Sequence, residues 1–377
     1  MRSPRSVLED TDWGSLEHAY DSASDTPDQL MLLLSGDAAL CGEALAYLDG
    51  AVLHQGTIYS ATAPAALFVA GILDDPRTLV PCESALPWDE RERPLRAALL
   101  EWLGNVAESA TYDDPEPDDD ETDDWEDYAQ AVEACRAIRP DLYARVAPFL
   151  DHTEPTVRQA AVGAVTDLLL APELAEQRAE VADRLLRSVE GMTPVERAGI
   201  ALTIGSWGIA PRSLLADEHP GVRACAALTK ALDDDPRARD EVRLALRDPR
   251  TADSWFDENP PQLDGQVRFT LVEALLRRTT AFDEVAEAAL AVARMTNAYT
   301  VDSDWGPLLI RAFPEGFVKG QELSAAQRQF LTAIVDNDRC WGSIANPTFW
   351  FSRAGLPADR DGLRALLTGS AAKSTRQ

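Results

Sequence analysis

The side chains that could do chemistry are few and dispersed. Four histidines, His18, His54, His152 and His219, lie too far apart in the sequence to form a metal site by local spacing. The sequence has no Gly-rich phosphate loop ending in Lys-Ser/Thr, no Gly-x-Ser-x-Gly elbow and no His-Glu-x-x-His motif. We therefore expect a protein that is not an enzyme, with no catalytic residues, cofactor or bound metal.

His54 is the sharpest of these candidates because Gln55 and Gly56 follow it. In a functional interpretation, the imidazole and the amide groups of a glycine turn would face a ligand. In a structural interpretation, Gly56 ends one helix as a left-handed cap, and Ser60 or Thr62 starts the next. The structural interpretation is favoured, and His54 stays a candidate partner-binding residue. His152 and His219 fall in turns between expected helices, where capping is favoured over catalysis.

An acidic run is the second candidate site. Between Asp113 and Asp127, 11 of 15 residues are acidic. Like charges repel and the run holds two prolines, so residues 113–124 are predicted to be an exposed, extended loop. Read from Asp118, the run lacks the glycine that an EF-hand needs at its sixth position. A solvated linker is favoured over a partner-binding segment. The candidate contacts of such a segment are Asp118, Asp119, Asp120, Glu121 and Asp123.

Composition narrows the class of partner. The chain has 377 residues, 64 acidic against 35 basic side chains, and a formal net charge of -29. That balance opposes binding to nucleic acid or to an anionic membrane, both of which need clustered Lys and Arg. A protein partner would be basic, and a monomeric state is favoured for the chain itself. Lys occurs at only three positions, and we interpret the excess of Arg as a GC-rich coding bias.

The cysteines and the apolar runs indicate the cellular compartment of the protein. Five cysteines, an odd number, lie far apart without a Cys-x-x-Cys pair, which is typical of reduced, buried thiols. The N-terminus has no apolar stretch of the kind found in signal peptides. The longest apolar run, Ala65 to Leu73, is far shorter than the ~20 residues of a membrane-spanning helix. We expect a soluble, cytoplasmic protein.

Apolar residues at i, i+3, i+4 and i+7 recur along most of the chain, so the elements that must position any site are helices. Capping boxes are predicted at Thr193 and Ser324. Four helices open with an apolar residue and an Arg, and each has a small residue three places after the apolar one that would let a neighbouring helix approach closely. These openings are Leu95-Arg96, Val157-Arg158, Val222-Arg223 and Val267-Arg268.

Two of these openings carry a family resemblance. The stretch Leu150-Asp151-His152-Thr153-Glu154-Pro155-Thr156-Val157-Arg158 resembles a HEAT repeat, with a short helix, an Asp-containing turn, Pro and then Val-Arg. The stretch from Leu215 to Ala226 is similar to it almost position for position, and weaker copies extend the resemblance over roughly residues 92 to 340. It implies an all-α fold, an armadillo-like α-solenoid (superhelix) of HEAT-like antiparallel helix pairs, with about 16 to 18 helices.

A second resemblance lies near the N-terminus. His18-Ala19-Tyr20, Asp25 and His54-Gln55-Gly56-Thr57 look like the opening of a bacterial, chiefly actinobacterial, family of HEAT-repeat proteins. That family is known mainly as hypothetical proteins, so the resemblance supports a fold and not a biochemical role.

The expected organisation places caps at both ends of a repeat array. Phe349, Trp350 and Phe351 cannot all face inward on one helix, so one is expected to be exposed; capping is favoured over partner binding, for which Trp350 is the candidate. The predicted regions are 1–91 (N-terminal helical cap with the first repeat), 92–112 (repeat helix), 113–124 (acidic loop), 125–340 (HEAT-like array), 341–369 (aromatic-rich cap) and 370–377 (flexible tail).

Stacked helix pairs form a concave face that typically binds proteins or peptides. The leading hypothesis is a non-catalytic scaffold or adaptor whose acidic concave surface binds a basic protein partner. An alternative is an immunity or antitoxin-like protein that sequesters a basic toxin domain. A third, enzymatic, alternative follows from two HEAT-like groups, the bilin lyases and the alkylpurine DNA glycosylases. The net charge opposes a glycosylase, and no residue points to a lyase.

Overall fold

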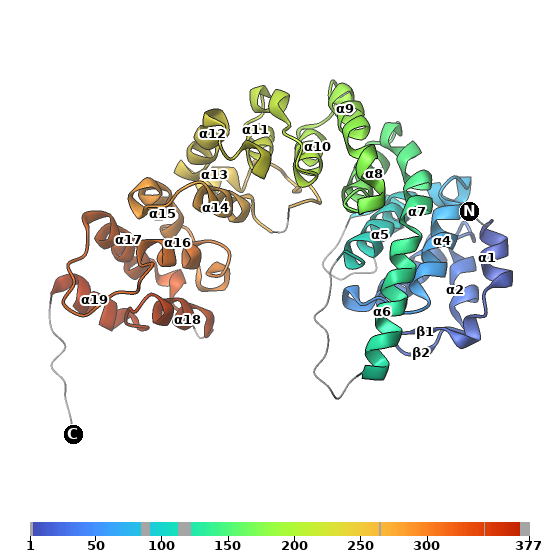
Figure 1. Cartoon of the computed structure of the whole chain (residues 1–377), viewed down its shortest axis with the longest axis horizontal. Helices are drawn as coiled ribbons and strands as arrows, with labels where there is room; N and C mark the ends of the chain where they lie inside the picture. Colours follow the sequence, from blue (N-terminus) through green and yellow to red (C-terminus); the bar gives the residue numbers. More distant parts are fainter. Residues whose placement is uncertain (1–2, 84–90, 112–121, 264, 343, 370–377) are drawn as a thin grey trace. The chain divides into compact units, whose positions relative to one another are not determined.

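A computed structural model describes residues 3–83, 91–111, 122–263, 265–342 and 344–369 (Figure 1). Helices hold 67% and strands 3% of the residues, so the expectation of a mostly α-helical protein is confirmed. Many helices pack against their neighbours in sequence. The chain divides into two compact units, Met1–Met192 and Thr193–Gln377. This division falls inside the predicted array 125–340, whose boundaries stay predictions.

The first part of the N-terminal unit combines short helices with two small hairpins. In the first hairpin, His18 pairs with Asp21, which leaves Ala19 and Tyr20 as its two-residue turn. The helices are α1 (Pro4–Asp10), α2 (Thr26–Leu32), α3 (Ala38–Tyr47) and α4 (Thr62–Ile72), and a π-helical turn, Leu48–Val52, extends α3. The strands are β1 (Glu17–His18), β2 (Asp21–Ser22), β3 (Pro81–Glu83) and β4 (Glu92–Pro94).

The second part of this unit is built on longer helices. These are α5 (Leu95–Ser109), α6 (Thr122–Ala137), α7 (Arg139–Val146), α8 (Pro155–Leu168) and α9 (Arg178–Ser188). The closest packing is between α5 and α8. A side chain at Gly104 would place its Cβ 3.1 Å from the Cα of Ala164, so glycine lets the two backbones approach. Both helices bury an apolar face, which includes Leu99, Leu103, Val165 and Leu168.

In the second unit, neighbouring helices are again in contact, α10 with α11 and α11 with α12 among them, and α15 also packs against α17. Both predicted capping boxes are confirmed, since Thr193 pairs with Glu196 and Ser324 with Gln327. The helices are α10 (Pro194–Ser206), α11 (Pro220–Ala227), α12 (Pro236–Arg247), α13 (Pro249–Ala252), α14 (Val267–Arg277), α15 (Ala286–Ala293), α16 (Trp305–Ala312), α17 (Ala325–Asp336), α18 (Asn346–Arg353) and α19 (Arg360–Thr368).

Candidate functional site

The two N-terminal stretches that carry the bacterial family resemblance meet at the first hairpin. The backbone N–H of Ala19 donates to the carbonyl of Ala51 at 3.0 Å, and the N–H of Ala61 donates to the carbonyl of Glu17 at 3.1 Å. The N–H of Glu17 also donates to Ser60 Oγ at 2.8 Å. The hairpin is therefore hydrogen-bonded to both ends of the segment 51–61, which contains His54.

A buried histidine holds the base of this hairpin. His18 is 8% exposed; its Nδ1 accepts the backbone N–H of Tyr20 at 3.1 Å, so Nε2 carries the proton and donates to Asp25 Oδ1 at 3.1 Å. Tyr47 donates its hydroxyl proton to the same Asp25 oxygen at 3.0 Å, and the Thr26 hydroxyl donates to Tyr47 at 2.7 Å. Burial raises the pKa of Tyr47 to about 12, while the bond from Thr26 lowers the pKa and Asp25 adds a smaller increase.

An Asp-His pair beside a tyrosine resembles a proton relay, but the direction of these bonds argues otherwise. A general base needs a free ring nitrogen within reach of its substrate. Both nitrogens of His18 are occupied, one as acceptor for Tyr20 N–H and one as donor to Asp25. The network can therefore fix the hairpin, and His18 offers no free ring nitrogen to a substrate in this structure.

The hairpin displays Tyr20 on the surface. Tyr20 is 69% exposed, and its ring meets the rings of His18 and His54 edge-on, with centroids 6.2 and 5.9 Å apart. Asp21, next to it, has a φ of 108°, a conformation that only a well-determined surrounding structure maintains. Glu17, Asp21 and Asp25 are exposed around it. We call Tyr20, His54 and these three carboxylates the Tyr20 surface.

His54 lies beside Tyr20 and closes the preceding helix. Its Nδ1–H donates to the carbonyl of Gly50 at 2.9 Å, which leaves Nε2 as an acceptor with no hydrogen bond to the described residues. Gly56 has a φ of 80°, so its predicted left-handed conformation is confirmed. The next helix, α4, begins at Thr62, whose hydroxyl donates to the Val52 carbonyl at 2.6 Å. His54 thus has a structural bond and also a free edge beside an exposed tyrosine.

The predicted repeat positions share one local arrangement. Val157, Val222 and Val267 are fully buried at the starts of α8, α11 and α14. Each following arginine returns to the segment before its helix. Arg158 Nη1 donates to the His152 carbonyl at 2.7 Å, Arg223 Nη1 to the Asp217 carbonyl at 2.9 Å, and Arg268 to the Asp253 carboxylate.

The turn residues near these arginines also form bonds. The Asp217 carboxylate binds Arg197 of α10 at 2.8 and 2.9 Å, and Asp151 binds Arg184 of α9. His152 Nδ1 accepts the N–H of Glu154 at 3.1 Å, which agrees with the turn-capping interpretation of this histidine. These hydrogen bonds and ion pairs join turn and helix, which is a structural role and not a catalytic one.

Arginine has a second structural role that sequence analysis missed. The last carbonyls of an α-helix have no partner within it and carry partial negative charge, so a cation with several N–H groups stabilises them. In both units an arginine from a later helix donates to such carbonyls. Arg136 and Arg139 bind the end of α5, Arg178 that of α8, Arg277 and Arg278 that of α11, Arg311 that of α14 and Arg360 that of α17.

A buried arginine–carboxylate pair lies in the second unit, between Arg268 and Asp304. Asp304 is fully buried, and its Oδ2 accepts from Arg268 Nε at 3.1 Å, from the Thr296 hydroxyl at 2.6 Å and from the Thr300 hydroxyl at 3.0 Å. Its Oδ1 accepts the N–H of Trp305 at 2.6 Å. Every acceptor direction in use serves packing, so this carboxylate is structural.

Residues 6–76 supply no such arginine themselves, although Arg77, next in the chain, donates to the Leu34 carbonyl after α2 at 3.0 Å. Between Arg5 and Arg77 the sequence contains neither Lys nor Arg. The same stretch holds twelve acidic residues: Glu9, Asp10, Asp12, Glu17, Asp21, Asp25, Asp28, Asp37, Glu43, Asp49, Asp74 and Asp75. We call residues 6–76 the cation-free region. The Tyr20 surface lies within it, and this absence of cations was readable from the sequence.

The C-terminal aromatic residues divide by exposure as expected. Phe351 is buried, Phe349 is 61% exposed, and Trp350 is half-buried. Trp350 Nε1 donates to Asp302 Oδ1 at 2.5 Å, and its ring covers Gly306 so closely that a Cβ there would lie 2.6 Å from it. Trp350 is therefore engaged within its own unit, and Phe349 is the residue of this trio that a partner could reach.

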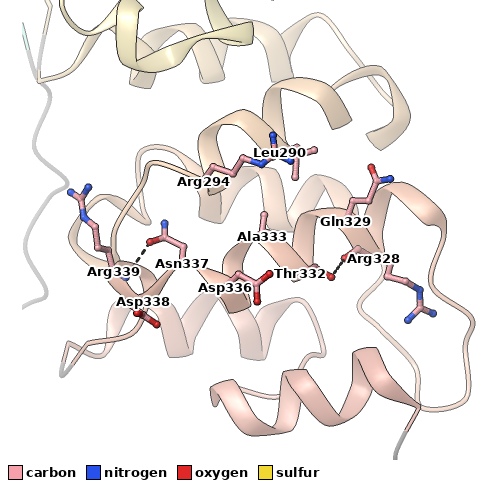
Figure 2. Close-up of a pocket in the computed structure, with 10 residues that line it drawn as sticks. All are labelled: Leu290, Arg294, Arg328, Gln329, Thr332, Ala333, Asp336, Asn337, Asp338 and Arg339. Atoms are coloured by element: carbon pink, nitrogen blue, oxygen red, sulfur yellow. Dashed lines mark hydrogen bonds between the residues drawn. The ribbon is translucent and has the colours of Figure 1, made fainter.

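A hollow of about 780 Å³ lies between α15 and α17 (Figure 2). Three arginines line it, Arg294, Arg328 and Arg339, together with Asp336 and Asp338. Figure 2 shows Arg328 and Arg339 extending in opposite directions. Because the cations do not converge and two carboxylates accompany them, the hollow is not organised to hold an anion.

The structure does not describe the predicted contacts of the acidic run. Asp118, Asp119, Asp120 and Glu121 lie outside the described residues, as does the side chain of Asp123. Within the described part of the chain, no three His, Cys, Asp or Glu side chains are grouped to hold a metal ion. No helix of that part is long and apolar enough to cross a membrane.

Fold and site together define a class: a largely helical protein whose neighbouring helices pack in pairs, with an anionic surface near one hairpin. Comparison with known proteins adds no narrower assignment, since no family model, curated protein or solved structure matches the chain.

Proposed function

We propose that the chain is a HEAT-like α-solenoid that serves as a non-catalytic scaffold or adaptor and binds a basic protein. The local arrangement at Val157-Arg158, Val222-Arg223 and Val267-Arg268 supports the repeat architecture, because a buried Val and an Arg tied to the preceding segment recur at each. Repeated helix pairs of this kind present extended surfaces to proteins or peptides.

The observation that carries the binding role is the distribution of charge. Many arginines are directed at helix-end carbonyls and buried carboxylates. Arg5 and Arg77, which flank the cation-free region, pair with two of its acids, and the region itself supplies no Lys or Arg for the other ten. Such a surface attracts cations and speeds the approach of a basic partner. Tyr20 adds what charge alone lacks, a fixed aromatic ring of the kind that dominates binding energy at interfaces and stacks with guanidinium groups.

The test is affinity capture of the tagged full chain from the cells that encode it, at ~0.1 and ~0.5 M salt, followed by mass spectrometry. We expect one stoichiometric basic partner that is lost at high salt. A Tyr20→Ala variant should lower recovery, and a Tyr299→Ala variant, which changes another highly exposed tyrosine in the other unit, should not. Recovery of no partner at either salt would contradict the proposed function.

The acidic segment is tested separately. Replacing residues 113–121 by a Gly-Ser stretch of the same length should weaken capture if the segment contributes to binding. Unchanged capture would assign it to the linker interpretation and would leave the role of the cation-free region intact.

A further inference from the structure

A second hollow lies among α1, α2 and α4 of the N-terminal unit. Its volume is about 710 Å³, within the range of roughly 300–1,000 Å³ typical of ligand pockets. Its lining includes Leu8 of α1, Met31 of α2, and Phe68 and Ile72 of α4. Phe68 and Ile72 are buried, whereas Met31 is 49% exposed. The hollow thus has an apolar floor and an accessible, flexible thioether at its edge.

The packing of α1 against α4 forms this hollow in advance of any ligand. Pro4 lies against Gly71, where a Cβ would come within 2.7 Å of the proline ring. Glycine at this position lets α1 approach α4 closely at one point, and the space lined by Leu8 and Met31 stays open beside it. No reorganisation of α1 is required before apolar side chains can enter.

The rim determines the charge of the occupant. Arg5 is paired with Glu9 at 2.8 Å, and Arg77 is bound to both oxygens of Asp75 at 2.9 and 2.7 Å. Both rim cations are thus neutralised by carboxylates of the rim itself. Asp74 is exposed at the same rim, and the chain from residue 6 to residue 76 supplies no further cation.

We propose that the α1–α2–α4 hollow binds an amphipathic basic helix of the partner, with its apolar side chains over Met31 and Phe68 and its Lys or Arg residues near Asp74. This inference rests on the proposed function for the nature of the partner. A helix laid into an apolar groove is a common mode of peptide recognition, and methionine adapts such grooves to different side chains. Charge complementarity selects a basic helix over an acidic one.

The first probe is a synthetic 14-residue helix of Leu and Lys with one apolar face, titrated into the full chain at ~0.15 M salt by fluorescence anisotropy. The same pattern with Glu in place of Lys is the charge control. We expect saturable binding of the Lys peptide only. Equal binding of both peptides, or no saturable binding, would overturn the proposal.

Matched variants locate the binding. Met31→Arg should weaken the Lys peptide about tenfold, because it fills the groove and adds a like charge. Leu244→Arg makes the same change at an apolar residue that is 54% exposed in the other unit, and we expect it to change affinity less than about twofold. Equal losses in the two variants would show non-specific attraction and overturn the proposal.

Asp74→Asn, on an exposed side chain, provides a variant that does not disturb packing, and it should weaken the binding of the Lys peptide about two- to threefold.

Failure of this inference can be distinguished from failure of the proposed function. If the Met31→Arg variant still captures the basic partner, the hollow is not the binding site, and the proposed function stands. If the peptide binds selectively at the hollow but the wild-type chain captures no partner, the proposed function is contradicted, and the hollow stands as a peptide-binding site.

Discussion

The cation-free region and the rest of the chain end their helices in different ways. In residues 6–76, side chains other than Lys and Arg bind carbonyls at several helix ends: His54 binds the Gly50 carbonyl, Thr62 the Val52 carbonyl, and Trp13 the Leu8 carbonyl. The end of α2 differs, since Arg77 donates to the Leu34 carbonyl. In the later helices, arginines do the same work, as Arg178 does for Leu170 and Arg311 for Leu276.

The difference shows that many arginines of this molecule stabilise helix ends, whereas the cation-free region carries mainly exposed acids. A guanidinium reaches two carbonyls at once and neutralises nearby carboxylates, so the arginine-capped helices are both stabilised and balanced. Neutral caps stabilise a helix end without adding positive charge. The N-terminal region can therefore stay folded while its surface remains predominantly anionic, which favours the binding of cations.

The strongest test of the arginine side of this comparison is Arg268→Leu. It leaves the fully buried Asp304 without its cation, and we expect a loss of about 3–5 kcal/mol in the free energy of unfolding. Urea unfolding followed by tryptophan fluorescence gives the value. Adding Asp304→Asn should recover part of the loss, because the unpaired charge is then removed. A loss below about 1 kcal/mol would contradict a structural role for this pair.

A milder test replaces an arginine cap with lysine. Arg311→Lys keeps the charge but cannot reach the Leu276 and Thr279 carbonyls together, so we expect a loss of about 1–2 kcal/mol. Denaturant midpoints of the variant and the wild type measure it. Arg364→Lys, at an exposed pair with Asp361, is the matched control and should change little. Equal effects at the two positions would show that charge and not geometry matters.

A third test concerns an acid that lies outside the cation-free region and lacks an arginine. Burial, with a smaller contribution from Glu108, raises the pKa of Asp167 to about 7. The unfolded chain releases this proton near pH 4, so between about pH 4 and 7 the folded state loses stability as pH rises. Asp167→Asn should therefore stabilise the protein by on the order of 1 kcal/mol at pH 8 and have little effect at pH 4. A difference independent of pH would contradict this assignment.

The smallest effect is expected on the anionic surface itself. Glu43→Lys places one cation among the carboxylates of the cation-free region, at an exposed position past the first turn of α3, and should stabilise the fold by about 0.3 kcal/mol, an effect that 1 M salt removes. A change to Lys at Asp361, already paired with Arg364, should be neutral or unfavourable. Thermal midpoints at both salt concentrations measure the difference.

Local sequence predicted local structure well in this chain. The capping boxes at Thr193 and Ser324, the left-handed Gly56 and the buried valines before Arg158 and Arg223 depend on residues within a few positions of one another. The chemistry of these short segments is sufficient to specify them.

Contacts between distant segments could not be predicted in the same way. Arg311 binds carbonyls more than 30 residues earlier, and any exposed-looking Arg in the sequence could have filled that role. The Tyr20 surface depends on a hairpin of two-residue strands, too short to leave an alternating pattern. The hollow beside Met31 depends on the fit of Pro4 to Gly71, which no periodicity records.

The most direct test of the central claim is zero-length carbodiimide cross-linking of the full chain to its captured partner, read by mass spectrometry. This chemistry joins carboxylates of the chain to lysines of the partner that lie in direct contact. We predict cross-links concentrated in the cation-free region, at Glu17, Asp21 and Asp74 among others. Cross-links confined to acids of the second unit would contradict the claim that this region is the binding surface.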